Sequence, residues 1–412
     1  MLIAIAWRNL WRNKLRSAVI FSSIAVGIIG AVVSDGFMAG MTDQRINAAI
    51  ANEVSDIQIH PPAFLLNGEM QYQIRNAGRY VRKIEKLPET KGVSLRLRTT
   101  AMAASANAGA GITLYGVNPE KEKSVSDLYR HMVSGGYFPA GEKIPVVMGQ
   151  KLAHKLNLGL GDKLIVTLTD SSGTIVSGAF QIVGLFKTAN TRFDESHVFV
   201  NKKDLASLTG YSGNTGNEIA IRLKNNDDTQ AVMKKLQSLF GKEINSGLIT
   251  LQSWDEIQPM LRSMIAMMNY FSYIFLLIIL AALAFAIVNT MLMAVMERTR
   301  EIGMLMALGM NKQKIFSMIM LETVFLSVVG ALLGLAVSLI VVQHYATYGF
   351  DLSSVAKGLN SIGYSARIFF RVNTDFYFIT ILLVIIIAML SSISPALKAL
   401  KLQPAIAIRE IQ

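Results

Sequence analysis

Four long apolar runs dominate the hydrophobic pattern of this chain of 412 residues. Each exceeds the roughly 18 residues that a helix needs to cross about 30 Å of hydrocarbon. The pattern therefore predicts an α-helical membrane bundle of four spans. We place the spans at residues 17–41, 263–296, 316–345 and 375–397.

The first apolar run has a second interpretation, a cleaved signal peptide. Its apolar length exceeds the core of about 7 to 15 residues that signal peptides carry. An amphipathic segment at residues 1–16 also precedes it, with Trp7 and Trp11 on one helical stripe and Arg8 and Arg12 elsewhere. We therefore predict a retained span, preceded by a cytoplasmic elbow helix whose Trp7, Arg8, Trp11 and Arg12 lie at the membrane interface.

The hydrophilic part of the chain, residues 42–262, mixes strand and helix periods. Residues 161–186 hold two alternating runs around an Asp-Ser-Ser-Gly turn, which predicts a β-hairpin. Residues 150–158 have the spacing of an amphipathic helix that Gly159 closes. The fold class we expect is the four-span bundle plus a large α+β domain inserted between spans one and two.

The second span is longer than a bilayer requires. The segment DEIQPM at residues 255–260 indicates a helix that runs without a break into it. The apolar residues 264–296 alone would extend about 50 Å at 1.5 Å per residue, whereas the hydrocarbon core is about 30 Å thick. The surplus predicts tilt, or a stalk that connects the external domain rigidly to the segment at residues 297–315.

Lysine and arginine near the span ends predict the orientation. Eleven of the 40 basic residues fall within residues 8–16, 298–314 and 398–409. The positive-inside rule places these stretches and both termini in the cytoplasm. It places the domain at residues 42–262 and a loop at residues 346–374 outside, and leaves residues 398–412 as a cytoplasmic tail.

Composition narrows the function. The chain is 52% hydrophobic and 17% charged, and its net charge of +12 comes mostly from the cytoplasmic flanks, so nothing indicates nucleic-acid binding. It has no cysteine, which excludes a disulfide framework and a thiol nucleophile. The five histidines lack metal-ligand spacing, and His197 beside Asp194 and Glu195 is a weak pair without a nucleophile. We therefore predict no catalytic residue and no metal site.

Four residues within the spans raise structural questions. Asp35 and Glu322 lie near span ends, where snorkelling or a neighbouring hydrogen bond can satisfy them, although a proton relay is an alternative. Gly330 and Gly334 form a Gly-x-x-x-Gly step that lets a second helix approach the third span closely. That contact is either intrachain packing or a dimer interface.

A short polar segment separates the second and third spans. Residues 299–308 are good helix formers, with Ile302, Leu305 and Met306 on one stripe and Gly309 as a stop. A helix with one apolar side and charged flanks suits docking into a groove on another protein. An inert interfacial loop is the alternative.

This segment resembles the cytoplasmic signature of the FtsX-like, MacB-type permeases of ABC transporters. The residues that match are Glu297, Arg298, Glu301, Ile302, Gly303, Ala307, Leu308 and Gly309. The basic N-terminal segment, the one-plus-three span arrangement and the closing SPALKALKLQPAIAIRE are similar to the family as well. The sequence FQIVGLFKTANTRFDESHVFVNKKDL, at residues 180–205, is most like lipoprotein-releasing members of the LolC and LolE type.

The resemblance implies a non-enzymatic permease of the bacterial inner membrane with a periplasmic domain. A separate cytoplasmic ABC ATPase dimer would bind ATP and Mg²⁺, since the chain has no phosphate-binding Gly-x-x-x-x-Gly-Lys-Ser/Thr loop. Contact with that ATPase is expected from Glu297, Arg298, Glu301, Ile302, Gly303, Leu305, Leu308 and Gly309. Other expected partners are membrane lipid, a second copy or a paralogous permease, and a lipoprotein with its periplasmic carrier.

The resemblance implies lipoprotein release first, with a MacB-like efflux permease and an FtsX-like regulator of a cell-wall hydrolase as alternatives. Lipoprotein-releasing members recruit their carrier through a protruding hook on an external hairpin. The turn in TLTDSSGTIV, residues 167–176, is tight instead. This chain would then be the subunit without a hook, or belong to another branch.

Overall fold

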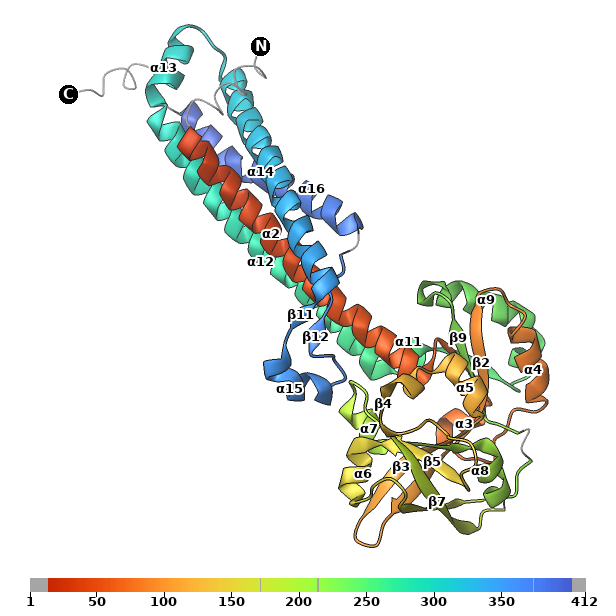
Figure 1. The fold of residues 1–412 in the computed structure, drawn as a ribbon. Coiled ribbons are helices and arrows are strands. Elements are labelled where there is room, and N and C mark those ends of the chain that lie inside the picture. Colours follow the sequence, from red (N-terminus) through yellow and green to blue (C-terminus); the bar gives the residue numbers. More distant parts are fainter. Residues whose placement is uncertain (1–13, 171, 213–214, 373, 402–412) are drawn as a thin grey trace. The chain divides into compact units, whose positions relative to one another are not determined.

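The computed structural model describes residues 14–170, 172–212, 215–372 and 374–401. They form two compact units, each described separately below. A helical unit comprises the described residues up to Asp43, Ile265–Asp351, and those from Arg367 onward (Figure 1). An α+β unit comprises Gln44–Met264 and Leu352–Ala366. The predicted interfacial residues Trp7, Arg8, Trp11 and Arg12 lie outside the described residues, as does most of the predicted tail.

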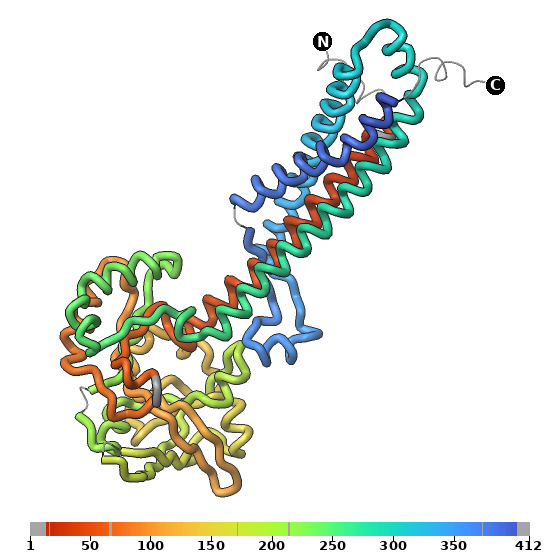
Figure 2. Tube along the Cα trace, turned by 180° about the vertical axis from the view of Figure 1, so that it is seen from behind, coloured from red at the N-terminus to blue at the C-terminus, as the bar shows by residue number. Residues whose placement is uncertain are grey.

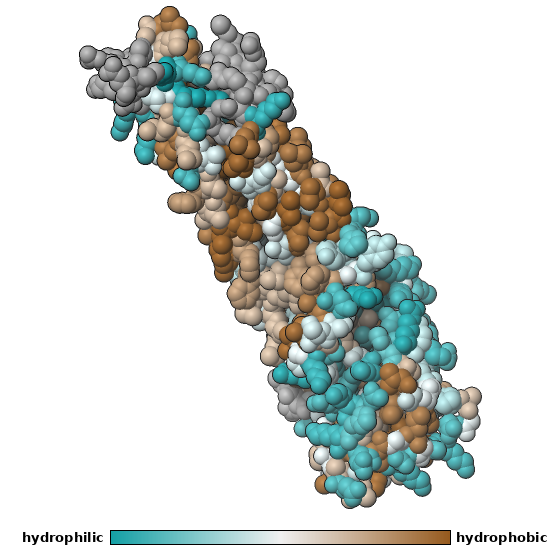
Figure 3. Space-filling model, turned by 60° about the vertical axis from the view of Figure 1, so that its left-hand side comes forward, coloured by the Kyte–Doolittle hydropathy of each residue, from teal (hydrophilic) through white to brown (hydrophobic). Residues whose placement is uncertain are grey.

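Long apolar helices build the helical unit. Among the described residues, four have the length and composition to cross a membrane: Ser17–Val54, Pro259–Glu297, Lys312–Tyr348 and Thr374–Leu400. They contain α2 (Lys14–Ala49), α12 (Pro259–Glu297), α14 (Lys312–Tyr348) and α16 (Thr374–Leu400). Within this unit α2 and α12 run side by side (Figures 1 and 2). Hydrophobic side chains gather on the surface of the unit (Figure 3). The prediction of four apolar spans is confirmed.

Close packing of α14 against α2 depends on two glycines. A Cβ atom on Gly334 would lie 2.9 Å from both the Cα and the carbonyl oxygen of Ala25. A Cβ atom on Gly330 would lie 2.9 Å from the Cβ of Ile24. Both distances are below ordinary van der Waals contact, so only glycine allows the two backbones to approach this closely. Of the two interpretations that the sequence left open, the geometry favours packing within the chain.

The long helix α12 does not continue from the helix before it, contrary to the prediction. The short helix α11 (Trp254–Ile257) ends, and Gln258 has φ −118° and ψ 70° before α12 begins at Pro259. A residue that precedes proline is disfavoured in the helical region because the proline Cδ clashes with its backbone. The break therefore falls where Pro259 requires it.

The α+β unit is built on strands that pair across large sequence separations. Its strands are β1 (Ile57–His60), β2 (Thr90–Ala104), β3 (Gly109–Val117), β4 (Met132–Gly135), β5 (Pro145–Gly149), β6 (Lys163–Thr169), β7 (Ile175–Phe186), β8 (His197–Asn201), β9 (Glu218–Leu223) and β10 (Thr250–Ser253). Its helices are α3 (Pro62–Asn67), α4 (Ala77–Ile84), α5 (Pro119–Val125), α6 (Gln150–Leu156), α7 (Thr191–Ser196), α8 (Lys202–Thr209), α9 (Thr229–Leu239), α10 (Gly241–Asn245), α11 and α15 (Ala356–Ser361).

Strand β2 pairs with one group of strands along its first half and with another group along its second half. In its first half it pairs with β9, which continues through β1 to β10. In its second half it pairs with both β3 and β6. Because β3, β8, β5, β7 and β6 are paired in that order, the strands close into a ring with its own buried core. A second core lies between β1, β9, α4 and α9.

A buried ion cluster holds β2, α5 and β9 together. Arg96 donates from Nη2 to Oε1 of Glu122 at 2.5 Å and from Nη1 to Oε1 of Glu218 at 2.7 Å. All three side chains are almost fully buried. Burial alone would raise the pKa of Glu218, but the guanidinium groups of Arg96 and Arg98 lower it below its ordinary value. The cluster therefore keeps its charges paired away from water.

Two predicted elements of this unit can be compared directly. The hairpin is confirmed, since β6 and β7 pair antiparallel from Lys163 opposite Gln181 to Thr169 opposite Ile175. The helix α6 is also present, but Asn157 closes it at φ 54°, and not Gly159. Asparagine tolerates the left-handed conformation that a helix C-terminus commonly adopts, so no glycine is needed there.

We expect Gly334→Val to destabilise the helical unit, because the added side chain meets the backbone of α2 at Ala25. Overpacking of this kind costs about 1 to 3 kcal/mol. Thermal unfolding of the purified full chain in detergent measures the effect. Ala336→Val, at an exposed position of the same helix, is the matched control and should leave the unfolding temperature unchanged. Equal unfolding temperatures for the two variants would contradict close packing at Gly334.

Candidate functional site

The segment between α12 and α14 forms a short helix with a well-defined end. Helix α13 spans Thr299–Ala307. Gly309 follows it with φ 89° and donates its N–H to Met306 O at 3.0 Å, while the N–H of Met310 bonds to Leu305 O at 3.0 Å. This pair of bonds is a Schellman motif, which satisfies the last carbonyls of a helix. Gly309 therefore stops the helix, as the sequence predicts.

The inner side of α13 belongs to the core of its own unit. Ile302 is only 4% exposed and packs with residues of α2, α12, α14 and α16, while the neighbouring Gly303 is also buried. Met306 packs partly against the same core. The sequence favoured a partner protein as the cover of the stripe Ile302, Leu305 and Met306. In the structure Ile302 and Met306 pack on the chain itself, whereas Leu305 is half-buried and lines a pocket. A hydrophobic period identifies residues that share a face, but it does not identify what covers that face.

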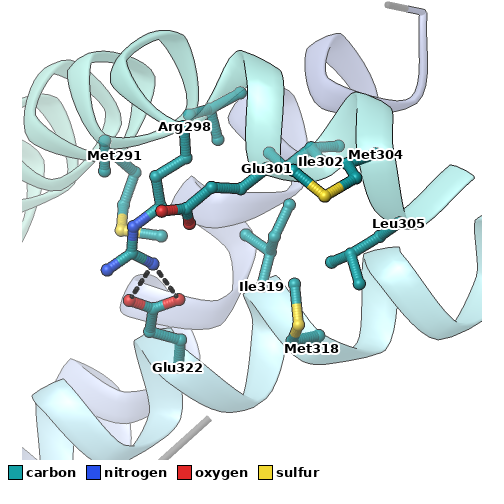
Figure 4. A pocket seen from close by; sticks show the side chains of 11 residues that line it. Met291, Arg298, Glu301, Ile302, Met304, Leu305, Met318, Ile319 and Glu322 are labelled. Atoms are coloured by element: carbon teal, nitrogen blue, oxygen red, sulfur yellow. Dashed lines mark hydrogen bonds and ion pairs between the residues drawn. The ribbon is translucent and has the colours of Figure 1, made fainter. Parts of the chain in front are cut away.

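An ion pair fixes the start of α13 to α14. Arg298 donates from Nη1 to Oε1 of Glu322 at 2.8 Å and to Oε2 at 3.0 Å (Figure 4). Each side chain is only 12% exposed. Of the two interpretations of Glu322, the geometry favours the neighbouring hydrogen-bond donor over a proton relay. The guanidinium group of Arg298 points to Glu322 of α14, so the ion pair joins α13 to α14.

A pocket of about 320 Å³ lies beside this ion pair, between α12, α13 and α14 (Figure 4). Its walls are mostly apolar, with Arg298, Glu301 and Glu322 as the charged side chains. The apolar lining comes from Met291, Ala294, Val295, Ile302, Met304, Leu305, Met318 and Ile319. Leu305, a predicted contact residue, thus faces this pocket.

The outer face of α13 combines two apolar side chains with charged residues. Leu308 is 81% exposed and Met304 is 56% exposed, one helical turn apart. Arg300 and Glu301 are exposed as well, and Glu297 is exposed just before the helix. Glu301 and Met304 also line the pocket described above. We call Arg300, Glu301, Met304 and Leu308 the α13 outer face. The contact residues predicted from the sequence do not include Met304, although its i, i+4 spacing with Leu308 was a signal for a shared face. They also leave out Arg300, which was considered only as one of the charged flanks.

The histidine considered for catalysis is not paired with the neighbouring acid. His197 stacks between Tyr115 and Phe193, and burial lowers its pKa to about 4. The carboxylate of Asp194 instead accepts from the backbone N–H and the hydroxyl of Thr188 at 2.9 and 2.8 Å. Within the described residues no group of three or more His, Asp or Glu side chains is placed to hold a metal ion.

Two family descriptions match the chain. The FtsX-like permease C-terminal family matches residues 273–404, which include α13 and the α13 outer face. The MacB-like periplasmic core domain matches residues 17–239, more than half of the chain. Together the two matches include all of the site residues except the N-terminal elbow.

Curated relatives point to the same class of protein. An uncharacterised ABC transporter permease of Methanocaldococcus jannaschii is 23% identical over 56% of this chain and 57% of its own length. The lipoprotein-releasing system transmembrane protein LolC of Xylella fastidiosa is 23% identical over 71% of this chain and 72% of its own length. The pyoverdine export ATP-binding/permease protein PvdT of Pseudomonas putida is 27% identical over 82% of this chain and 51% of its own length.

The matched region thus spans between about half and about three quarters of these relatives. Relatives with the MacB name, from Neisseria species, match over a shorter part of the chain. The family matches, the apolar helices and the α+β unit agree with one another. The chain is therefore a membrane protein of the FtsX-like ABC transporter permease family, with a MacB-like periplasmic core domain.

Proposed function

We propose that the chain is the permease subunit of a mechanotransmission-type ABC transporter. A separate cytoplasmic ATPase dimer hydrolyses ATP and binds the α13 outer face. The α+β unit is periplasmic, lies between the first and second spans, and moves in response. The chain itself has no catalytic residue, and a second copy or a paralogous permease completes the transporter.

The observation that carries this proposal is the way α13 is held. Ile302 and the Arg298–Glu322 ion pair fix its inner side to the helical unit, so a force on α13 is passed to α14 and α12. Its outer side offers Met304 and Leu308 beside Arg300 and Glu301. A small apolar centre with a charged rim is the usual composition of a protein interface. This arrangement supports a role of α13 in transmitting movement.

Two continuous helices provide the path from this site to the α+β unit. The helix α2 extends from Lys14 to Ala49, and α12 extends from Pro259 to Glu297, directly before α13. Each contains residues of both units. An unbroken helix is therefore the path that we propose for movement between this site and the α+β unit.

Lipoprotein release is the activity we propose first. The similarity to a LolC protein over 71% of the chain supports it. The connection between β6 and β7 is only residues 170–174, too short for a protruding hook, so in this assignment the carrier binds the paralogous subunit. The similarity to a pyoverdine exporter over 82% of the chain favours efflux as the second candidate.

We expect the double variant Glu301→Lys, Leu308→Glu to lose its binding to the partner ATPase. It reverses one charge and places another at the most exposed apolar residue of the α13 outer face. The affinity for the ATPase should fall at least about tenfold, which corresponds to about 1.4 kcal/mol. The measurement is copurification of the ATPase from membranes, with ATP hydrolysis by the purified complex.

Leu239→Glu is the matched control, because Leu239 is an exposed leucine of α9 in the α+β unit. This variant should copurify with the ATPase as the unaltered chain does. If the double variant also copurifies with the ATPase and the complex still hydrolyses ATP, the α13 outer face is not the docking site.

A charge swap tests whether α13 must be held to α14. Arg298→Met leaves the Glu322 carboxylate without its guanidinium, which costs about 3 to 5 kcal/mol for a fully buried pair and less at 12% exposure. We expect lower thermal stability and weaker stimulation of the ATPase. The swap Arg298→Glu, Glu322→Arg should recover part of both, as a double-mutant cycle measures. No coupling between the two positions would contradict this role.

A further inference from the structure

The carboxylate of Glu53 is the centre of a buried polar cluster in the α+β unit. After Ala49 the helix α2 widens into a π-helical turn, Ile50–Val54, which ends at Ser55 with φ 71°. The side chain of Glu53, only 8% exposed, projects from this turn. π-helical turns are rare and are frequently found at functional sites. The turn therefore places one carboxylate where a regular helix would not.

The first contact of Glu53 is with the start of α12. Gln258, in the break between α11 and α12, donates from Nε2 to Oε2 of Glu53 at 2.9 Å. The capping box of Ser253 and Glu256 holds α11, so Gln258 has a defined position. The end of α2 and the beginning of α12 are thus joined through one carboxylate.

The second contact is with the segment that leads into α7. Asn190 donates from Nδ2 to Oε1 of Glu53 at 3.0 Å. The other side of this amide accepts from the backbone N–H groups of Arg192 and Phe193, because Asn190 is the N-cap of α7. The cap fixes the orientation of the amide, so its NH₂ group can face only Glu53. This contact joins the two helix ends to the closed ring of strands that contains β8.

The third contact of Glu53 is with Arg45, which itself lies against the segment Leu352–Ala366. Arg45, two turns earlier on α2 and 7% exposed, donates from Nη1 to Oε1 of Glu53 at 3.0 Å. Gly363 lies directly against this guanidinium, since a Cβ atom there would be 2.7 Å from Nε of Arg45. Gly363 has φ 84°, which also favours glycine. Helix α15 of the same segment contacts α7.

The contacts of this cluster depend on the negative charge of Glu53. A buried carboxylate is stable only when donors satisfy it, and the charge of Arg45 balances that of Glu53. The negative charge of Glu53 is felt nearby: burial raises the pKa of Asp194 to about 7, and Glu53 adds to that increase. Loss of the carboxylate charge therefore weakens all three contacts together.

We infer that Glu53 is a positioning residue for force transmission, which joins the ends of α2 and α12 to the ring of strands and to Leu352–Ala366. This inference rests on the proposed function, because it names the joint through which the moving helices displace the α+β unit. Without the Glu53 contacts each helix end can move separately. The α+β unit then no longer follows the helices as one body.

The test is Glu53→Gln in the full transporter complex. The substitution keeps the size of the side chain but removes its charge and turns one acceptor into a donor facing Arg45, Asn190 and Gln258. Because the chain has no cysteine, two introduced cysteines are the only sites in each copy that a spin label can occupy. We choose the exposed positions Met267 on α12 and Lys151 on α6, measured by pulsed electron paramagnetic resonance with and without ATP.

We expect the unaltered chain to show a distance shift with ATP, and Glu53→Gln to lose that shift while it still binds and hydrolyses ATP with the partner. Without nucleotide, Glu53→Gln should already broaden the distance distribution. Gln258→Leu, which removes only the α12 contact, should broaden it as well. Glu85→Gln, which removes the exposed ion pair with Lys121, should behave like the unaltered chain.

A Glu53→Gln protein with the unaltered distribution and the unaltered shift would overturn the inference. If even the unaltered chain shows no shift with ATP, the proposed function fails instead. The nucleotide-free distributions then still decide whether Glu53 joins the helix ends: broadening supports the joint, and an unchanged width overturns it. Loss of folding is detected separately by thermal unfolding of each variant.

Discussion

The hydrogen-bonded backbone of α12 is the constraint on which the rest of the structure depends. Its 39 residues extend about 58 Å at 1.5 Å per residue, whereas a hydrocarbon core is about 30 Å thick. In hydrocarbon every backbone N–H and C=O must be satisfied within the helix, so polar side chains and breaks gather at its two ends. Arg298 pairs with Glu322 at one end, and Gln258 pairs with Glu53 before the other.

In the proposed function these two ends connect the ATPase to the α+β unit. At one end Ile302 and the Arg298–Glu322 ion pair make α13 a rigid extension of the helical unit. At the other end the Glu53 cluster holds the end of α2 and the start of α12 within the α+β unit. Rigid attachment at both ends is what the proposed function requires, because a flexible joint at either place would absorb the movement.

The sequence carried enough information for the elements formed by local rules. Apolar run length predicted the four spans, and Gly309 predicted the end of α13. Pro259 also carried a signal for the break at Gln258, which the prediction overlooked. The prediction placed Ile302 and Met306 against a partner, because a hydrophobic period does not reveal that the bundle of the same chain covers these two residues.

Features that join distant parts of the chain were beyond sequence reasoning. The ring closes only because Met102 on β2 lies opposite Thr167 on β6, a pairing that no local pattern specifies. No sequence pattern indicated the π-helical turn at Ile50–Val54, so the sequence analysis did not identify Glu53. Its partners Asn190 and Gln258 are more than a hundred residues away, and only the folded chain brings them together.

The central claim is that α13 and the α+β unit lie on opposite sides of the membrane. Single cysteines at Leu308 and at Lys151, both exposed, test this directly with a thiol reagent that cannot cross the inner membrane. In cells with a permeable outer envelope and an intact inner membrane, the account predicts labelling at residue 151, and labelling at residue 308 only after the inner membrane is opened. Labelling of residue 308 in intact cells, or equal labelling of both positions, would contradict it.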